Sequence, residues 1–327
     1  MSALDHWHPV LLSRELGDAP RAVRLDGRDL VVFRTRDGVG ALPDRCGHRA
    51  MRLSEGRVCE GRLTCPYHGW QWDADGVGKV PASPKHRPTM ESLAAVERDG
   101  AVWISRRGAH PRFPKLEVEG WWCFARHRVR VDAPLELVLD NFIEVEHTPT
   151  THLVLGYALD AMPELRTETT LRDDEVEVYN EGRQRPIPGV LRAMLELQAN
   201  DHFVDHWITR FSPVYTVYEQ YHLDPATRAV RPTRLRIAVF FNPVDDARTE
   251  LVVLGYVSQP PWGRAGLNAA AYPLVRALLL EEIRRDKVMI ESLADRRTSL
   301  QGAALGRFDK ALVASRARIA RIYREDT

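Results

Sequence analysis

The sequence has few cysteines, almost no net charge and no long hydrophobic run, and each of these absences excludes a class of protein. No stretch approaches the roughly 18 consecutive apolar residues of a membrane-spanning helix, so we expect no transmembrane segment. The 46 basic and 45 acidic residues leave a formal net charge of +1, which does not favour nucleic acid or an anionic membrane as a partner. Four cysteines in 327 residues are too few for a disulfide-stabilised fold. The N-terminus, MSALDHWHPV, lacks the basic and apolar regions of a secretory signal, which predicts a cytoplasmic protein.

Two regions of the chain differ in their hydrophobic pattern. Up to about residue 110, short apolar runs alternate with Asp-Gly pairs, which is typical of antiparallel strands joined by tight turns. Pro111 and Pro114 then interrupt the pattern, because proline fits neither a helix interior nor a central strand. We therefore predict a small all-β domain over residues 1–112 and a second domain over residues 113–327.

The second region combines long strands with helices. The pattern predicts a helix over residues 134–147, strands over most of 164–260 with a short helix or loop at 186–200, and helices over 266–323. The fold class is therefore α+β, an antiparallel sheet with helices at both ends of the domain sequence.

Two cysteines and two histidines in the first region have the spacing of a metal site. Cys46 and His48, followed by Cys65 and His68, form the pattern C-x-H-x16-C-x2-H. Two thiolates and two imidazoles are the ligands of a [2Fe–2S] cluster in which histidines replace two of the cysteines on one iron. Gly47 and Gly69 would allow tight turns that bring backbone N–H groups to the cluster sulfides. A structural zinc site is the alternative, but zinc fingers space their histidines more widely.

The stretch LSEGRVCEGRLTCPYHGW resembles the Rieske motif of ring-hydroxylating oxygenases. It differs from the Rieske proteins of cytochrome bc complexes, which brace the two loops with a disulfide, because Met51 and Tyr67 occupy the positions of those cysteines. Cys59 and Cys123 have no paired histidine, and we interpret both as buried core residues.

A second pair of histidines, His147 and His152, lies five residues apart in the second region. We expect Pro149 to end the preceding helix near His147, so that the two imidazoles can converge. Two histidines and one carboxylate on one face of an Fe(II) ion are the ligands of non-heme oxygenases. The pattern N-x-x-D-x-x-H-x4-H resembles the mononuclear iron site of Rieske oxygenases. That resemblance implies Asp286 on a late helix as the third ligand; a solvated helix charge is the alternative.

Two neighbouring polar residues also have counterparts in the family. The resemblance implies a carboxylate three residues before the first ligand histidine that links the two metal centres of adjacent subunits. Here that residue is Glu144 where the family has aspartate, and Asp140 is a second candidate on the same predicted helix face. Asn141 would be a weak ligand, an orienting hydrogen-bond partner or a packing residue.

Several further side chains have simpler interpretations. His202 and His206 would line a substrate pocket, with a second metal site as the alternative. The aromatic residues of the following strands would belong to the sheet core. The basic stretch SRARIARIYRE would be a solvated helix face, with subunit contact as the alternative.

The resemblance implies a Rieske domain followed by a helix-grip, START-like catalytic domain in a homotrimer, with a [2Fe–2S] cluster and a mononuclear Fe(II). The chain has neither a G-x-G-x-x-G nor a C-x4-C-x2-C motif, so a separate reductase, with or without a ferredoxin, would supply electrons. The implied reaction is O2-dependent hydroxylation or oxidative demethylation of a small aromatic or apolar molecule. Cis-dihydroxylation, desaturation, oxidative cyclisation and a non-enzymatic electron carrier or binding protein are the alternatives.

Overall fold

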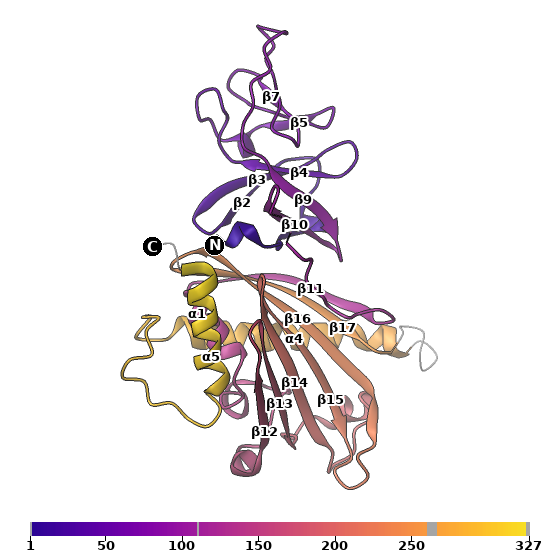
Figure 1. The fold of residues 1–327 in the computed structure, drawn as a ribbon. Coiled ribbons are helices and arrows are strands. Elements are labelled where there is room, and N and C mark those ends of the chain that lie inside the picture. The colour runs from indigo at the N-terminus through magenta and orange to yellow at the C-terminus, as the bar shows by residue number, and fades with distance from the viewer. Residues whose placement is uncertain (1, 110, 260–266, 325–327) are drawn as a thin grey trace.

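The computed structural model describes residues 2–109, 111–259 and 267–324. Figure 1 shows an N-terminal part built of strands and loops above a larger part in which helices pack against one broad sheet. The α+β class predicted from the sequence is confirmed. No helix in the described part of the chain is long and apolar enough to cross a membrane.

The N-terminal part consists of two antiparallel sheets. The first has the strand order β1-β10-β9-β4-β3-β2, and the second has the order β5-β6-β7-β8. The strands of the first sheet are β1 (His8–Leu12), β2 (Arg21–Leu25), β3 (Arg28–Arg34), β4 (Val39–Pro43), β9 (Leu93–Arg98) and β10 (Ala101–Arg106). Those of the second are β5 (Arg57–Cys59), β6 (Arg62–Thr64), β7 (Gln71–Trp72) and β8 (Gly78–Lys79). The small second sheet lies farthest from the rest of the molecule (Figure 1).

The larger part is built on a seven-stranded antiparallel sheet in the order β11-β17-β16-β15-β14-β13-β12. Its strands are β11 (Trp122–Val131), β12 (Arg166–Leu171), β13 (Glu175–Arg183), β14 (His202–Phe211), β15 (Val214–Leu223), β16 (Val230–Asp245) and β17 (Arg248–Val257). The α-helices are α1 (Leu135–Phe142), α2 (Thr148–Thr151), α3 (Gly189–Met194), α4 (Leu267–Glu291) and α5 (Lys310–Ile319). Short 3-10 segments are η1 (Ala3–Asp5), η2 (Ser13–Glu15), η3 (Leu53–Glu55) and η4 (Leu159–Glu164), and a π-helical turn, η6 (Ala320–Arg324), ends the described chain.

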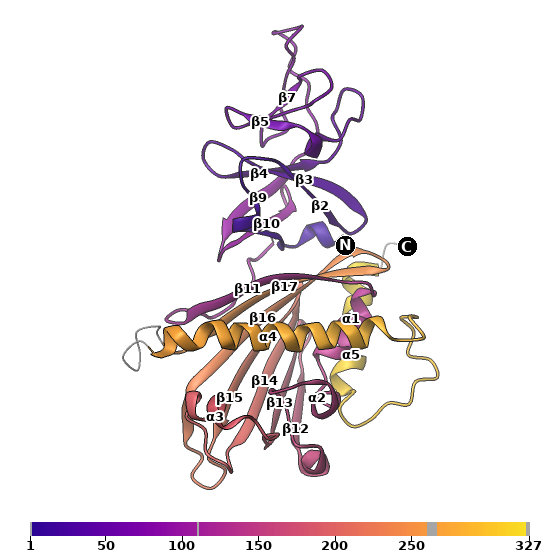
Figure 2. The same ribbon diagram turned by 180° about the vertical axis from the view of Figure 1, so that it is seen from behind.

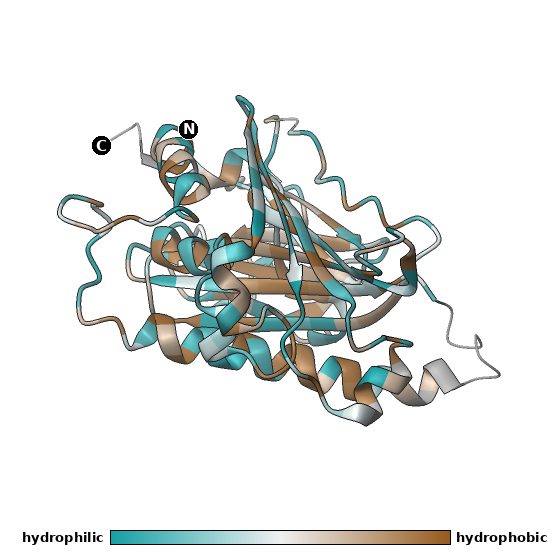
Figure 3. Cartoon of the chain, turned by 90° about the horizontal axis from the view of Figure 1, so that it is seen from below, coloured by the Kyte–Doolittle hydropathy of each residue, from teal (hydrophilic) through white to brown (hydrophobic). Residues whose placement is uncertain are grey.

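Helix α4 runs across one face of the seven-stranded sheet, as Figure 2 shows. Strand β14 illustrates why this face is covered: Phe203, Asp205 and Trp207 point to it and are all buried. On the opposite face, His202 and His206 are half-exposed, and Val204 between them is buried. Seen from below, apolar and polar residues alternate along the strands and around the helices (Figure 3). The sheet and α4 therefore enclose a core in which a polar side chain such as Asp205 is an exception.

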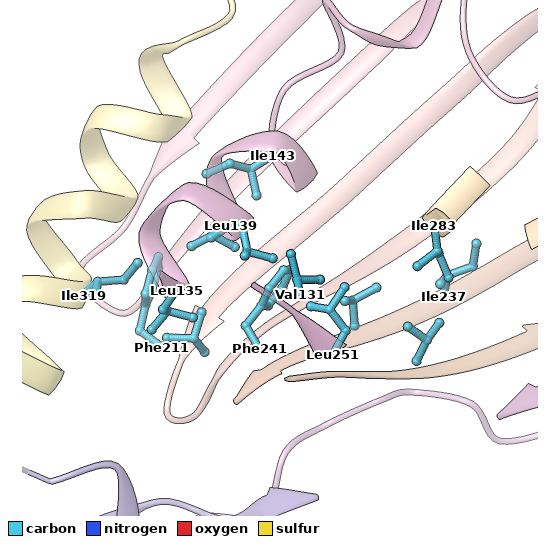
Figure 4. Packing of buried hydrophobic residues seen from close by; sticks show 14 of the residues in the cluster. Val131, Leu135, Leu139, Ile143, Phe211, Ile237, Phe241, Leu251, Ile283 and Ile319 are labelled. Carbon is cyan, nitrogen blue, oxygen red and sulfur yellow. The ribbon is translucent and has the colours of Figure 1, made fainter. Parts of the chain in front are cut away.

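Helices α1 and α5 close one end of this core. Leu135 and Leu139 of α1 pack against Phe241 and Leu251 of the sheet and lie near Ile319 of α5, as Figure 4 shows. All five side chains are almost completely buried, so the helices are held by apolar burial of about 25 cal/mol per Å².

The two parts of the molecule share a packed interface. Trp103 of β10 meets Phe240 of β16 edge-on at a ring-centroid distance of 4.9 Å. Asp26 N–H also donates to the carbonyl oxygen of Pro243 over 2.7 Å, so the turn after β2 is pinned to the end of β16. The connection between the parts, residues 107–121, contains no strand or helix among its described residues, and the predicted boundary between 112 and 113 falls within it.

Two predicted helical regions and the interpretation of two cysteines need correction. The helix expected over 134–147 ends at Phe142, and the helical region expected over 266–323 is interrupted between α4 and α5; residue 266 lies outside the described part. Cys59 and Cys123 are half-buried instead of buried, although Cys123 packs against a cluster of core residues.

The basic C-terminal stretch was also misjudged, as far as the described residues extend. Ser315 is fully buried, and the guanidinium of Arg316 forms a buried ion pair with Asp140. Burial raises the pKa of Asp140 to about 6, although Arg316 opposes that rise. Asp140 is therefore a structural partner of α5.

Replacing Arg316 with methionine should lower the free energy of unfolding by about 3–5 kcal/mol, because the Asp140 carboxylate is left buried without its partner. A carboxyl group whose pKa is higher in the folded than in the unfolded state favours folding when protonated, so the loss should be smaller near pH 5 than near pH 8. Urea unfolding at both pH values measures this, with the exposed Arg321→Met as control. A loss that does not change with pH would contradict the role of Asp140.

Candidate metal centres

The four predicted cluster residues lie on two similar loops at the tip of the N-terminal part. In the first loop, Cys46 N–H donates to the carbonyl oxygen of Met51 over 2.8 Å; in the second, Cys65 N–H donates to that of Trp70 over the same distance. Each loop is therefore closed by the same backbone hydrogen bond, and each carries one cysteine and one histidine. In both loops the hydrogen bond spans five residues, from Cys46 to Met51 and from Cys65 to Trp70.

The glycines of these loops act differently from one another. Gly69 has a φ of +70°, as predicted for a tight turn, but the equivalent position of the first loop is Ala50, with a φ of +56°. Gly47 is not in the left-handed region. A Cβ atom there would lie 3.0 Å from the indole ring of Trp72, so Gly47 permits close packing. Gly47 lies within the turn that the Ala50 N–H closes onto the Cys46 carbonyl oxygen over 2.9 Å, as expected, but the left-handed position of that turn is Ala50.

The donor set at the tip fits a [2Fe–2S] cluster. Cys46 and Cys65 are each 2% exposed, and both are free thiols. The rings of His48 and His68 lie 4.6 Å apart, and His48 stacks on Trp70 at 4.4 Å with parallel planes. His48 Nδ1 is buried and has no hydrogen-bond partner among the described residues, as expected for a nitrogen reserved for a metal. Burial raises the pKa of the Cys46 thiol, an effect that iron would overcome by binding the thiolate.

His147, His152 and Asp286 converge in the larger part. The Nε2 atoms of the two histidines lie 3.3 Å apart, and Asp286 Oδ1 lies 3.3 Å from the first and 3.0 Å from the second. Metal–ligand bonds of about 2.1 Å at right angles would place the ligand atoms about 3 Å apart. The triangle therefore has the size of one face of an octahedral site, with the remaining positions open to other ligands.

Helix α2 sets the spacing of the two histidines. His147 is its N-cap and His152 its C-cap, with Pro149 in the first turn. Pro149 thus begins a second helix instead of ending the first, which corrects the sequence-based explanation of how the histidines converge. A one-turn helix separates the two imidazoles in the chain, yet their Nε2 atoms meet.

Asp286 comes from α4 and is only 5% exposed, so it is not a solvated helix charge. Burial opposes ionisation of this carboxyl group, but hydrogen bonds from His147 and His152 leave its pKa below the ordinary value. Conversely, Asp286 and Glu144 raise the pKa of His147 to about 10 despite its burial. The site thus concentrates acceptors and negative charge around one point, which suits a divalent cation.

Glu282, one turn before Asp286, is a residue that the sequence did not single out. Its buried carboxylate accepts backbone N–H groups of the chain just after His152: Leu153 at 2.9 Å, Val154 at 2.8 Å and Leu155 at 3.3 Å. The helix that supplies Asp286 therefore also holds the segment that follows His152. In the sequence, Glu282 looks like any other charge of the run LLLEEIRRDK.

Replacing Glu282 with glutamine should weaken iron binding about 10- to 100-fold, because the segment that orients His152 loses charge-assisted hydrogen bonds. Competition with a chelator, read out as the iron retained per chain, measures the effect. Glu281→Gln is the matched control, since the ion pairs of Glu281 in the described part of the chain are with Arg284 and Arg285 on the same helix. Equal iron retention in both variants would contradict a positioning role for Glu282.

Glu144 contacts the first histidine of the triangle. Its Oε1 atom is paired with His147 Nδ1, and Oε2 accepts the backbone N–H of His147 over 3.3 Å. Glu144 lines both the inner cavity and a hollow on the outer surface. Asn141 also lines both, and its Oδ1 atom is buried without a partner among the described residues. Asp140, paired with Arg316, does not contact the triangle in the described hydrogen bonds, so the second candidate is disfavoured.

A cavity of about 70 Å³ adjoins the triangle. That volume exceeds the space of a single water molecule, so it is more than a packing defect. Most of the surface that lines it is apolar, although apolar or aromatic residues are 8 of the 17 lining residues. They come from α1, the segment after α2, α4 and the inner face of the sheet: Phe142, Leu155, Trp207, Tyr218, Ile237, Val239, Leu279 and Ile283. Asp205 and Gln220 are polar exceptions on the sheet.

The predicted pocket histidines lie elsewhere. His202 and His206 point to the other face of β14, where they pair with Glu181 and Glu177. The expectation that they line the substrate pocket is therefore wrong, because residues between the inward-facing positions of a strand face away. Trp207 and Tyr218, interpreted as sheet core, line the cavity as well.

Comparison with known protein families agrees with both parts of the chain. The Rieske [2Fe-2S] domain family matches residues 6–97, and the family described as the vanillate O-demethylase oxygenase C-terminal domain matches residues 131–325. The fold and the two donor sets thus define a two-domain iron protein. Because the second match covers more than half of the 327 residues, the chain belongs to the Rieske oxygenase family with a vanillate O-demethylase-type C-terminal domain. The resemblance and the two predicted cofactors are confirmed.

Curated relatives match mainly over part of the chain. The methylxanthine N1-demethylase NdmA of Pseudomonas putida is 34% identical over 171 residues, which are 45% of this chain and 46% of the relative. The oxygenase subunit of 3-chlorobenzoate-3,4-dioxygenase of Comamonas testosteroni is 40% identical over 127 residues, 35% of this chain and 29% of the relative. The matched stretches span less than half the length of these relatives.

Solved structures match over nearly the whole chain. Dicamba monooxygenase bound to 3,6-dichlorosalicylic acid superposes with a TM-score of 0.82 at 21% identity, covering 98% of this chain and 97% of that chain. A mutant of NdmA from Pseudomonas putida CBB5 with caffeine superposes with a TM-score of 0.74 at 21% identity, covering 98% and 96%. These similarities confirm the two-domain fold.

Proposed function

We propose that this chain is the oxygenase component of a Rieske oxygenase system that hydroxylates or oxidatively demethylates a small aromatic or apolar molecule with O2. The observation that carries the proposal is the convergence of His147, His152 and Asp286 at the wall of a mainly apolar cavity. An electron carrier or binding protein has no need of three metal-ligating atoms within hydrogen-bonding distance of one another beside such a cavity.

The two donor sets divide the work between two metal centres. Cys46, His48, Cys65 and His68 would hold the [2Fe–2S] cluster, and His147, His152 and Asp286 would hold the iron. When bound, the cluster supplies single electrons and the iron activates O2 beside the substrate. The chain itself orients the iron-binding imidazole through Glu144, and its apolar cavity wall excludes water from the substrate.

Glu144 is proposed to connect the iron site with the cluster of a neighbouring subunit. Its carboxylate lies between the inner cavity and the outer hollow, and the hollow is bordered by Met289 and Leu293, which are 47% and 44% exposed. Exposed apolar side chains around a polar hollow suit contact with another subunit. We therefore propose a homotrimer in which the cluster-bearing tip of one subunit docks at this hollow of the next, with Asn141 supporting the same site.

The electron donor, the domain boundary and the location of the protein are further parts of the proposal. We propose a separate reductase, with or without a ferredoxin, as electron donor, since no dinucleotide-binding motif occurs in the sequence. We also propose residues 1–112 and 113–327 as the two domains, and the cytoplasm as the location.

Single-turnover oxidation with ¹⁸O2 tests the reaction. The holoprotein would be reduced stoichiometrically with dithionite, freed of excess reductant and mixed with ¹⁸O2 and one of three probes: anisole, N-methylaniline or toluene. We expect a demethylated or hydroxylated product, detected by mass spectrometry: phenol and formaldehyde from anisole, aniline and formaldehyde from N-methylaniline, or benzyl alcohol from toluene. The ¹⁸O label is expected in benzyl alcohol, whereas the phenol from anisole keeps the oxygen of the ether. Dihydroxylated or desaturated products would support the alternative oxygenase outcomes. If the reduced cluster is reoxidised without any product, in protein that retains all its iron, the result would favour an electron carrier.

A further inference from the structure

An acidic side chain lies in the apolar face of the sheet at the cavity. Asp205 is paired in register with Asn180 of β13 and with Gln220 of β15, so that three polar residues form a row across three adjacent strands. Asp205 and Gln220 line the cavity beside the iron-binding triangle, and each is only 8% exposed. Burying a polar group without a full set of partners costs free energy, so this row requires an explanation.

The hydrogen bonds of the row leave acceptors unused. Gln220 donates its Nε2 amide to Asp205 Oδ1 over 3.1 Å, which fixes the orientation of the amide. As a result, Gln220 Oε1 is an acceptor, and it is buried with no partner among the described residues. No described residue donates a hydrogen bond to Asp205 Oδ2. The pair thus offers two oxygen acceptors at the cavity, Gln220 Oε1 and Asp205 Oδ2, against one remaining N–H donor on Gln220 Nε2.

The charged residues that line the cavity also favour a ligand that donates hydrogen bonds and carries no negative charge. No arginine or lysine belongs to its described lining, whereas four carboxylates do: Glu144, Asp205, Glu282 and Asp286. Of these, Glu144 and Asp286 contact the histidines and Glu282 accepts backbone N–H groups, which leaves Asp205 without a charged hydrogen-bond partner in the described structure. A carboxylate ligand beside Asp205 would meet like charge and two acceptors, so it would be rejected.

We infer that Asp205 and Gln220 form a recognition pair for a substrate that carries a neutral hydroxyl or N–H donor on its apolar body, and that they exclude carboxylates. This inference rests on the proposed function, because it assigns the substrate class of the same cavity. The donor would satisfy the acceptor of Gln220, the second oxygen of Asp205, or both, while the apolar part lies against Trp207 and Ile237. A site built from buried acceptors discriminates strongly against analogues that cannot fill them.

Binding of four matched benzene derivatives to the anaerobic holoprotein tests the inference. Benzyl alcohol carries a neutral donor, benzyl methyl ether lacks one, benzoate carries a carboxylate and benzylamine carries a charged donor. We expect ligand-observed NMR titration at about millimolar concentration to show benzyl alcohol binding about tenfold tighter than the ether, with benzoate not bound.

Two variants locate the effect. Gln220→Leu should reduce the preference for benzyl alcohol over the ether about tenfold, and Asp205→Asn should make benzoate binding detectable by removing the charge. Thr216→Val is the matched control, since Thr216 is a buried polar residue of β15 that does not line the cavity.

Four results would overturn the inference: benzoate or benzylamine binding more tightly than benzyl alcohol, no preference for the alcohol over the ether, no binding of the alcohol, or unchanged selectivity in both variants. The proposed function is tested separately by iron content and ¹⁸O2 turnover. Holoprotein that oxidises donor-free probes as well as matched alcohols would contradict only the substrate class, whereas protein without the third iron would contradict the proposed function itself.

Discussion

The His147→Ala variant should contain about one iron fewer per chain than the wild type, with acid-labile sulfide unchanged, and should lose O2-dependent turnover by a factor of at least about 1,000. We expect about three irons and two sulfides in the wild-type protein, two irons belonging to the cluster and one to the triangle. The loss follows from the geometry, because His147 supplies one corner of a triangle whose sides are 3.0–3.3 Å. Removing one ligand of three leaves Asp286 and His152 without a complete facial site.

Iron and sulfide analysis of anaerobically purified protein measures this effect, and the visible absorption of the cluster shows that the N-terminal part is intact. His206→Ala is the control, because His206 pairs with Glu177 on the opposite face of the sheet. Asp286→Asn should reproduce the loss of iron from a different element. Two irons in fully loaded wild-type protein, unchanged by either substitution, would contradict the iron site and favour an electron carrier.

The sequence predicted the cluster residues well because their chemistry is local. Cys46, His48, Cys65 and His68 lie within 23 residues, and each loop is closed by hydrogen bonds inside itself. The resemblance of this motif to a known family then predicted the fold of the whole chain. Asp286 required more than local spacing, since it meets His152 across 134 residues of sequence. Only the resemblance and its position on a late helix pointed to it.

Other features could not be predicted because they depend on packing. The apolar spacing of residues 134–147 continues beyond Phe142, but the carboxylate of Glu144 accepts the backbone N–H of His147 and thereby stabilises a turn instead of a longer helix. Asp205 follows the alternation of β14, which reveals that its side chain faces inward but not that Gln220 meets it there. Glu282 has the sequence context of an ordinary surface charge, and only the tertiary contact with the segment after His152 distinguishes it.

The Glu144→Gln variant should retain its full iron and sulfide content yet transfer electrons from cluster to iron at least about 100-fold more slowly. Glutamine keeps the length of the side chain but replaces the carboxylate that pairs with His147 Nδ1. A ligating imidazole loses its charged partner, and the proposed link to the neighbouring subunit loses its negative charge and one of its two acceptor oxygens. The iron triangle, which is formed by Nε2 and Oδ1 atoms, would remain.

Stopped-flow absorption follows the reoxidation of the reduced cluster in the presence of O2 and of a probe that the wild-type protein oxidises. The rate of reoxidation measures electron transfer from the cluster to the iron. Glu146→Gln is the matched control, because Glu146 is exposed and lines the same outer hollow without contacting the triangle in the described hydrogen bonds. Glu144→Asp, which restores a carboxylate one methylene shorter, should recover more of the rate than glutamine does. Iron lost from Glu144→Gln would make Glu144 a positioning residue for His147 alone; reoxidation as fast as in Glu146→Gln would remove it from the electron path. If cluster reoxidation is slow while both metal centres are intact, and aspartate restores part of the rate, the carboxylate must act between the two centres rather than within one of them.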